Sequence, residues 1–131
     1  EKPLSSGLRS RADTLIRSLG NGRLIERFEH VEVVGMEVPM TLRSSGADGP
    51  AVAWVGTIDL VFKDPDTKRW VVADFKTTSV SRGDPGTVAK RYQAQGDAYT
   101  EALQVALELP ERPVFEVWLV EVDDWIALPV A

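Results

Sequence analysis

The chain has 131 residues, of which 44% are hydrophobic and 27% charged, and its formal net charge is -5. This length suits one domain with one core, and the absence of cysteine excludes disulfides, thiolate zinc sites, iron–sulfur clusters and cysteine nucleophiles. The acidic balance argues against tight, independent nucleic-acid binding, in which phosphate contacts dominate, and no apolar run reaches the ~20 residues of a membrane-spanning helix.

The first half of the chain predicts one helix and three strands. Apolar residues recur at helical spacing over residues 8–19, and the sequence GNG then ends the pattern. The valine-rich segment 31–42 predicts a strand with a bend near Gly35. Two further strands, 51–63 and 69–77, are joined by the polar sequence DPDTK, and this arrangement predicts a β-hairpin.

The second half predicts the longest helix, over residues 86–107, with Asp84 as an N-cap in front of a proline. Strands are predicted at 113–121 and, more briefly, at 125–130. The order helix, three strands, helix, two strands predicts an α/β fold with a mixed sheet, in which an antiparallel meander is followed by a crossover helix and a further strand. We interpret the whole chain as a single domain.

Two aspartates, Asp59 and Asp74, interrupt the apolar runs of the predicted hairpin, and Lys76 follows the second by two residues. Side chains alternate along a strand, so Asp74 and Lys76 point to the same face, and strand pairing can bring Asp59 close to Asp74. Neighbouring carboxylates in an apolar setting repel, and one takes up a proton unless a cation lies between them. A divalent cation that prefers oxygen ligands, Mg²⁺ or Mn²⁺, fits this pattern best.

Plainer interpretations of these residues stay open. Each aspartate can cap a turn, and Lys76 can form an ion pair at a solvated edge. Glu37, in the preceding strand, can join the carboxylates if that strand flanks the hairpin, although alone it is typical of a surface position. Gln95 and Tyr99 share one face of the long helix because they are four residues apart. A glutamine there needs hydrogen-bond partners, which a carboxylate-rich site, a phosphate or water can provide.

Together these segments resemble the RecB-type nuclease domain of the PD-(D/E)XK superfamily. The segments GTIDLVF, WVVADFKT and QGDAY match the family patterns G-x-x-D, D-x-K-T and Q-x-x-x-Y in the same order, and MEVPM resembles its glutamate-bearing strand. The resemblance covers roughly residues 31–105. Among relatives, it is nearest to the C-terminal nuclease domain of AddA- or RecB-like helicase–nucleases of the UvrD superfamily.

The resemblance implies a restriction-endonuclease-like core and a role for the hairpin residues. Asp59 and Asp74 would ligate Mg²⁺, or Mn²⁺, together with the backbone carbonyl of Phe75. Lys76 would position the attacking water and stabilise charge that develops on the phosphate. The implied chemistry is in-line hydrolysis of a phosphodiester, in which the metal makes hydroxide accessible near neutral pH and neutralises charge.

The resemblance also implies roles outside the hairpin. Glu37 would assist at the metal, directly or through water, and Gln95 and Tyr99 would orient the site or contact the DNA backbone. Three basic residues near the start of the long helix can contact phosphates or simply solvate the helix end, and both interpretations stay open. They are Arg82, Lys90 and Arg91.

The function implied is a Mg²⁺-dependent DNA exonuclease domain of an ATP-dependent helicase–nuclease that processes DNA ends in recombination repair, in the bacterial cytoplasm. Its partners would be double-stranded ends or single strands of DNA, the rest of the helicase chain, which holds the ATP-driven motor, and a second subunit; no membrane partner is expected. Two alternatives stay open: an inactive nuclease-fold module for DNA binding or protein docking, and a stand-alone phage- or restriction-type nuclease.

Two features depart from the family pattern. Members of this type usually carry a metal-binding histidine on an early helix, whereas the only histidine here, His30, lies at a predicted strand entrance shortly before Glu37. We do not expect it to be that ligand. The chain is therefore expected to be an excised C-terminal fragment without the histidine-bearing helix, weakly active or inactive alone. The lack of cysteine separates it from the iron–sulfur branches of the family.

Overall fold

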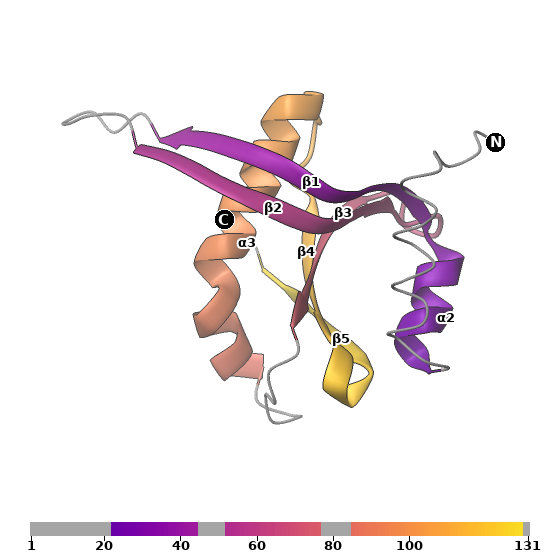
Figure 1. Ribbon diagram of the computed structural model, residues 1–131. Coiled ribbons are helices and arrows are strands. Elements are labelled where there is room, and N and C mark those ends of the chain that lie inside the picture. Colours follow the sequence, from indigo (N-terminus) through magenta and orange to yellow (C-terminus); the bar gives the residue numbers. More distant parts are fainter. Residues whose placement is uncertain (1–21, 45–51, 77–84, 130–131) are drawn as a thin grey trace.

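The computed structural model describes residues 22–44, 52–76 and 85–129. These ranges form one five-stranded sheet with a helix on each face (Figure 1). The elements in chain order are α2 (Arg23–His30), β1 (Glu32–Ser44), β2 (Val52–Lys63), β3 (Trp70–Lys76), α3 (Pro85–Leu107), β4 (Val114–Leu119), the 3₁₀ turn η1 (Val120–Val122) and β5 (Asp124–Leu128). Neither helix of the described ranges has the length and apolar character needed to span a bilayer.

The sheet has the predicted mixed topology. Its strands follow the chain order, with β1, β2 and β3 antiparallel, β3 and β4 parallel, and β4 and β5 antiparallel. Helix α3 makes the crossover that a parallel pair requires. The predicted bend near Gly35 is a register irregularity between Val33 and Gly35. The predictions of the mixed sheet, the hairpin and the long helix are therefore confirmed.

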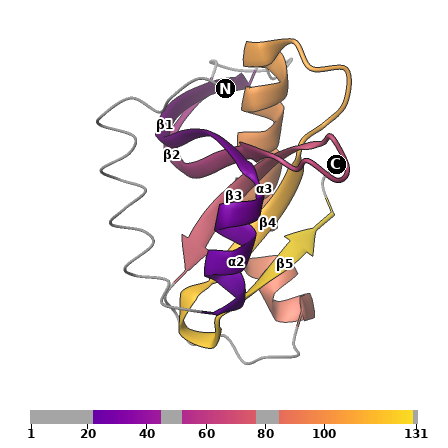
Figure 2. The ribbon, with the colours of Figure 1, turned by 90° about the vertical axis from the view of Figure 1, so that its right-hand side faces the viewer.

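Both faces of the sheet are covered, so its central strands are apolar on both sides. Figure 2 views the sheet with α2 in front and α3 behind. The cluster beside α2 contains Leu24, Ile25, Phe28, Val31, Met36, Leu60, Phe62, Val71, Ala73 and Trp118. The cluster beside α3 contains Ile58, Val61, Val72, Tyr92, Tyr99, Leu103, Phe115, Val117, Leu119 and Leu128. Beyond this core, β1 and β2 continue as a long twisted arm that crosses α3 (Figure 1).

Close approach of α3 to the sheet depends on a glycine. A Cβ atom at Gly96 would lie 2.3 Å from the ring of Phe115 on β4. The helix therefore lies closer to β4 than any larger residue at this position would allow. This close packing sets the distance between α3 and the sheet. It thereby also sets the position of Tyr92 of α3 beside Lys76 of β3.

Helix α2 corrects the interpretation of His30, which is the last residue of this helix and not part of a strand entrance. Its apolar residues are Leu24, Ile25 and Phe28, which lie on one buried face. The helix start has no local side-chain cap; the backbone N–H groups of Arg23 and Leu24 donate to Asp123, at 2.8 and 3.1 Å. A capping residue about 100 positions away leaves no local start signal to recognise.

Other differences from the predicted elements are small. Strand β4 ends at Leu119, two residues early, because the chain turns through η1 and through Asp123, whose φ is 55°. The helix predicted over 8–19 and the N-cap assigned to Asp84 lie outside the described residues.

Candidate active site

The candidate site lies where the ladder between β2 and β3 opens. Paired residues run from Lys63 with Trp70 to Leu60 with Ala73, and the pairing ends there. The next register position would place Asp59 opposite Asp74. Instead, the side chain of Asp59 accepts a hydrogen bond from the backbone N–H of Phe75 through Oδ2, at 2.9 Å. A carboxylate thus replaces the backbone acceptor that a continuing strand would have supplied.

The other side of β3 remains fully paired at this level. Asp74, Phe75 and Lys76 pair with Val117, Trp118 and Leu119 of β4. The end of β3 is therefore held by β4 and open toward β2. In a strand, the N–H and C=O of one residue point to the same neighbour, so the carbonyl of Phe75 faces the same opening as its N–H.

Asp74 is a buried carboxylate that the protein satisfies only in part. Its side chain is 6% exposed, and Oδ2 forms an ion pair with Lys76 Nζ at 2.7 Å. The contact lacks the alignment of a hydrogen bond, and within the described residues Oδ2 has no hydrogen-bond partner. Burial raises the pKa of Asp74 to about 6; the nearby Asp59 carboxylate adds to this rise, and Lys76 opposes it.

Lys76 lies on the same face of β3 as Asp74, as the strand alternation predicted. Its side chain is mostly buried, and Nζ lies 4.6 Å from the centre of the Tyr92 ring on α3. Two carboxylates and an ammonium thus meet at one opening of the sheet, beside a helix. The grouping is consistent with acid–base or electrostatic chemistry on an anionic substrate.

The donor set fits a hard divalent cation. Two carboxylates lie together, one of them buried with an oxygen short of hydrogen bonds, and a cation between them would relieve the repulsion that raises the pKa of Asp74. The described residues contain no group of three histidine, cysteine or acidic side chains placed to hold a metal. The carbonyl of Phe75 is the further oxygen that strand geometry directs to the same opening.

Comparison with known protein families decides the class. Residues 2–127 match the family described as the PD-(D/E)XK nuclease superfamily. The chain belongs to this superfamily. Membership makes the chain a nuclease domain with DNA as the implied substrate. No curated protein sequence matches the chain.

Glu37 stands apart from the two aspartates of this nuclease site. The flanking pairs, Met36 with Leu60 and Val38 with Ile58, put it level with Asp59 across the β1–β2 ladder. Its φ of 52° interrupts the extended strand, so simple alternation does not fix the direction of its side chain, which is exposed. The structure places Glu37 next to the site along the sheet without grouping its carboxylate with the other two.

Gln95 and Tyr99 lie on the side of α3 that faces the sheet. Tyr99 is 7% exposed and packs against the first residue of the G-x-x-D pattern: a Cβ at Gly56 would lie 2.5 Å from the tyrosine hydroxyl. The glycine and tyrosine of the two family patterns are thus in contact. Gln95 is half-buried and makes no hydrogen bond with Asp59, Asp74 or Lys76 within the described residues.

The three basic residues assigned to DNA contacts are only partly visible. Arg82 lies outside the described residues, as does the side chain of Lys90. Arg91 is exposed on α3. Their assignment therefore stays a prediction.

His30 lies at the far end of the hairpin from the aspartates. Its Nε2 is 2.8 Å from Oδ2 of Asp66, in the turn that joins β2 to β3. Asp59 lies four residues before Lys63, where β2 enters this turn, and Asp74 lies four residues after Trp70, where β3 leaves it. His30 is on a helix upstream of Glu37, as in the family pattern. Its partner, however, is Asp66 in the β2–β3 turn and not a residue of the carboxylate site.

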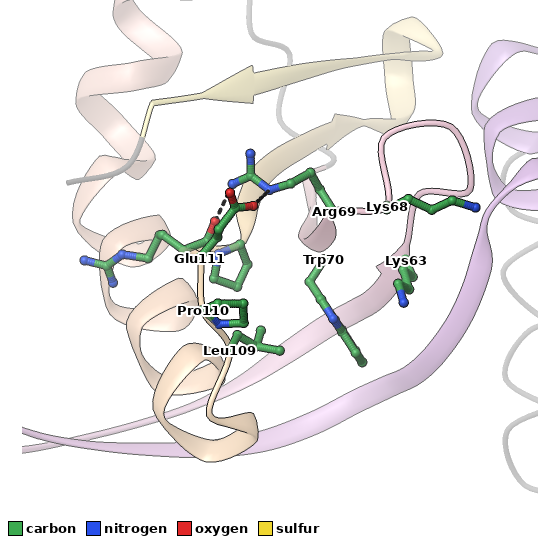
Figure 3. A pocket seen from close by; sticks show the side chains of 9 residues that line it. Lys63, Lys68, Arg69, Trp70, Leu109, Pro110 and Glu111 are labelled. Carbon is green, nitrogen blue, oxygen red and sulfur yellow. Dashed lines mark hydrogen bonds and ion pairs between the residues drawn. The ribbon is translucent and has the colours of Figure 1, made fainter.

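A pocket of about 140 Å³ also lies away from the carboxylates, at the start of β3 (Figure 3). Trp70, Leu109, Pro110 and several basic residues line it, but Arg69 is already engaged by Glu111, at 3.2 Å, and by a backbone carbonyl. Ligand sites usually enclose about 300 Å³ or more. The pocket is therefore too small for a nucleotide and is not the catalytic centre.

Sequence reasoning found the aspartates and the lysine but not the position of Tyr92 beside them. Tyr92 lies on α3 three residues before Gln95. Its ring is buried and lies beside the Lys76 ammonium. The sequence signal that could have identified Tyr92 is its place on the same helix face as Gln95 and Tyr99.

Proposed function

We propose that this domain is a Mg²⁺-dependent deoxyribonuclease that degrades DNA from its ends by hydrolysing phosphodiester bonds. The observation that carries the proposal is the meeting of Asp59, Asp74 and Lys76 at the open end of the β2–β3 ladder. This site belongs to a chain of the PD-(D/E)XK nuclease superfamily, and its residues occupy the positions of the G-x-x-D and D-x-K patterns.

Each residue has a defined task in this proposal. Asp59, Asp74 and the carbonyl of Phe75 hold the metal ion, which when bound neutralises charge on the phosphate and lowers the pKa of a bound water. The N–H of Phe75 keeps Asp59 directed to the opening. The ammonium of Lys76 donates hydrogen bonds to a phosphate oxygen or to the attacking water and stabilises the negative charge that develops.

We further propose that the domain works within a RecB-like helicase–nuclease, in the processing of DNA ends during recombination repair in the bacterial cytoplasm. The order and spacing of the three family patterns support this branch. The acidic net charge of -5 supports it too, because a nuclease to which a motor delivers DNA does not need to bind DNA strongly by itself. ATP would act only on the motor, and the remaining helicase chain and a second subunit would be its partners.

The test begins with metal binding. The chain is titrated with Mg²⁺ and Mn²⁺ by calorimetry, with the Asp59→Ala/Asp74→Ala double variant as the control. Saturable binding that the double variant loses is the expected result. Binding that persists unchanged in the double variant would contradict the assigned ligands.

The activity test uses end-labelled linear DNA and circular DNA of the same sequence, in single- and double-stranded forms. The expected outcome is Mg²⁺-dependent loss of linear DNA while circles survive. Lys76→Ala should reduce the rate by about 10³-fold yet retain metal binding, whereas Asp74→Ala should lose both. Lys63→Ala is the matched control, because Lys63 is a lysine of the same hairpin that lies four residues beyond Asp59, at the end of β2 next to the turn, and it should keep the wild-type rate.

One observation favours an alternative, a nuclease-fold module without activity that binds DNA or docks to a protein. The described residues contain no group of three side chains placed to hold a metal. If the chain neither binds Mg²⁺ nor cuts linear DNA, but retains DNA in a shift assay, this alternative replaces the proposed function. Cutting of circular DNA would instead indicate an endonuclease of the stand-alone type.

A further inference from the structure

Lys76 has a second partner, and that partner comes from α3. Its Nζ lies 2.7 Å from Asp74 Oδ2 and 4.6 Å from the centre of the Tyr92 ring. Tyr92 is 8% exposed, so packing between α3 and the sheet holds the ring in place. An ammonium at this distance from the face of an aromatic ring is attracted by the negative charge density of the ring.

The two partners differ in how they respond when the site is in use, and this step rests on the proposed function. Asp74 is a proposed metal ligand, so its negative charge is shared once the site is loaded, and its attraction for Lys76 then weakens. The ring of Tyr92 carries no formal charge. Unlike the carboxylate of Asp74, an aromatic ring does not ligate a hard divalent cation. Its attraction for the ammonium therefore does not depend on the state of Asp74.

We propose that Tyr92 is the positioning residue of Lys76, and that its ring keeps the ammonium at the catalytic opening when Asp74 is engaged elsewhere. A lysine side chain has a flexible four-carbon stem and loses considerable rotational freedom when it is fixed. A leucine at position 92 would keep an apolar side chain in the core but would not attract the charge. The residue type, and not only its volume, is therefore the functional feature.

The direct test is NMR of the lysine ε-methylene groups in metal-free protein. The chain has only five lysines, so a ¹³C-lysine sample gives few signals, and Lys76→Arg assigns the one of interest. Ring current should move the Lys76 ε protons upfield of those of the other lysines. The upfield shift should persist in Tyr92→Phe and in Asp74→Asn, and disappear in Tyr92→Leu.

The Asp74→Asn measurement decides the inference without any change to the core. If the upfield shift vanishes in Asp74→Asn, the ion pair alone places Lys76, and Tyr92 is only a packing residue. If the shift survives in Tyr92→Leu, the Tyr92 ring is not its source, and the proposed contact between the ring and the ammonium is wrong. Should Tyr92→Leu fail to fold, Asp74→Asn still gives the answer.

Kinetics supply a second readout. Tyr92→Leu should lower kcat for linear DNA by about tenfold with little change in KM, and Tyr92→Phe should restore the wild-type kcat. Leu103→Ala is the matched control, since Leu103 is buried on the same helix face. This substitution removes packing contacts and leaves the Tyr92 ring beside Lys76. It should keep kcat within about twofold at a temperature where all variants are folded.

Failure of the two proposals can be told apart. If the wild-type chain cuts no DNA but the Lys76 signal depends on Tyr92 and not on Asp74, the nuclease function is wrong and the positioning role stands. If the wild-type chain cuts DNA and Tyr92→Leu keeps full kcat, the nuclease function stands and Tyr92 has no part in it.

Discussion

Two buried carboxylates lie on neighbouring strands, Glu116 on β4 and Asp74 on β3. They differ in how many hydrogen-bond partners the protein supplies to each. Each is 4% exposed. Glu116 accepts hydrogen bonds from Arg27 Nε to Oε1 at 2.9 Å and from Arg27 Nη2 to Oε2 at 2.5 Å, and a third from the indole N–H of Trp118 at 3.0 Å. Asp74 has an ion pair on Oδ2, no hydrogen bond there within the described residues, and a second carboxylate nearby.

The difference separates a charge that the fold satisfies from one that it leaves partly unsatisfied. Arg27 comes from α2 and lies near the rings of Phe62 and Trp125, so the pair with Glu116 fastens that helix to the sheet. The charge of Asp74 is left short of partners at an opening of the sheet. A buried charge that the protein does not satisfy costs free energy, and a cation or a proton is what relieves that cost.

Among the substitutions that test this comparison, the largest effect is expected at the pair of Glu116 and Arg27. Glu116→Ala should lower the free energy of unfolding by about 3–5 kcal/mol, because it leaves the buried Arg27 guanidinium without its main partner. Urea unfolding of the purified chain measures this loss. Asp64, 3.7 Å from Arg27, compensates only weakly at that distance.

A double replacement distinguishes the pair from simple packing. Arg27→Met combined with Glu116→Met removes both charges while it keeps apolar volume, and such replacements are often close to neutral. Recovery of most of the stability in the double variant is the expected result. If Glu116→Ala alone costs less than about 1 kcal/mol, the pair does not have the structural role assigned to it.

The smaller, second effect comes from Asp74 and depends on pH. Its pKa rises from the ordinary value of 3.8, which the unfolded chain keeps, to about 6 in the folded protein. Between these two values the folded state therefore binds more protons than the unfolded chain. Asp74 stabilises the fold most below about pH 3.8, and this contribution is lost as the pH rises through about 6. The shift corresponds to about 3 kcal/mol.

Comparison with Asp74→Asn isolates this contribution, because the amide does not titrate. In EDTA, the stability of Asp74→Asn relative to wild type should increase by about 2.4 kcal/mol between pH 4 and pH 7.5, because the carboxyl of the unfolded chain is already partly ionised at pH 4. Added Mg²⁺ should then stabilise wild type at pH 7.5 and leave Asp74→Asn unchanged. A constant difference between the two proteins across this range would show that Asp74 titrates normally.

The central strands and the carboxylate pair were predictable because their signals are local. Valine-rich runs, the DPDTK turn and the long amphipathic segment define β2, β3 and α3 without knowledge of the rest of the chain. Asp59 and Asp74 stood out because aspartate disfavours strands, and the hairpin register brought them together. Strand alternation also placed Lys76 correctly on the face of Asp74.

What the sequence did not reveal depends on contacts across long separations. Helix α2 begins at a carboxylate from Asp123, and Arg27 finds Glu116 at a separation of 89 residues. Neither pairing leaves a pattern within a short window. The left-handed φ of Glu37 was unpredictable for a different reason, since it is a backbone property that a strand pattern does not report, and the role of Glu37 at the metal stays a prediction.

The smallest expected effect concerns the contact between the two family patterns, Gly56 and Tyr99. Gly56 pairs with Met40 in the β1–β2 ladder and has no positive φ, so the space taken by Tyr99, and not backbone conformation, is what requires glycine. A Cβ would lie 2.5 Å from the tyrosine hydroxyl and 2.8 Å from a ring carbon. Gly56→Ala should therefore cost about 1–3 kcal/mol of stability.

A double-mutant cycle assigns the cost to this contact. In a Tyr99→Leu background the ring is gone, so Gly56→Ala should cost less than about 0.5 kcal/mol. Gly35→Ala is the matched control in the same pair of strands, since its Cβ would meet the Val38 side chain at 2.9 Å, and the resulting cost should be the same with and without the Tyr99 ring. Equal costs of Gly56→Ala in both backgrounds would show that the strand, and not Tyr99, demands the glycine. The contact holds α3 against β2 three residues from Asp59, so its loss should also lower the nuclease rate, through displacement of the helix that carries Tyr92.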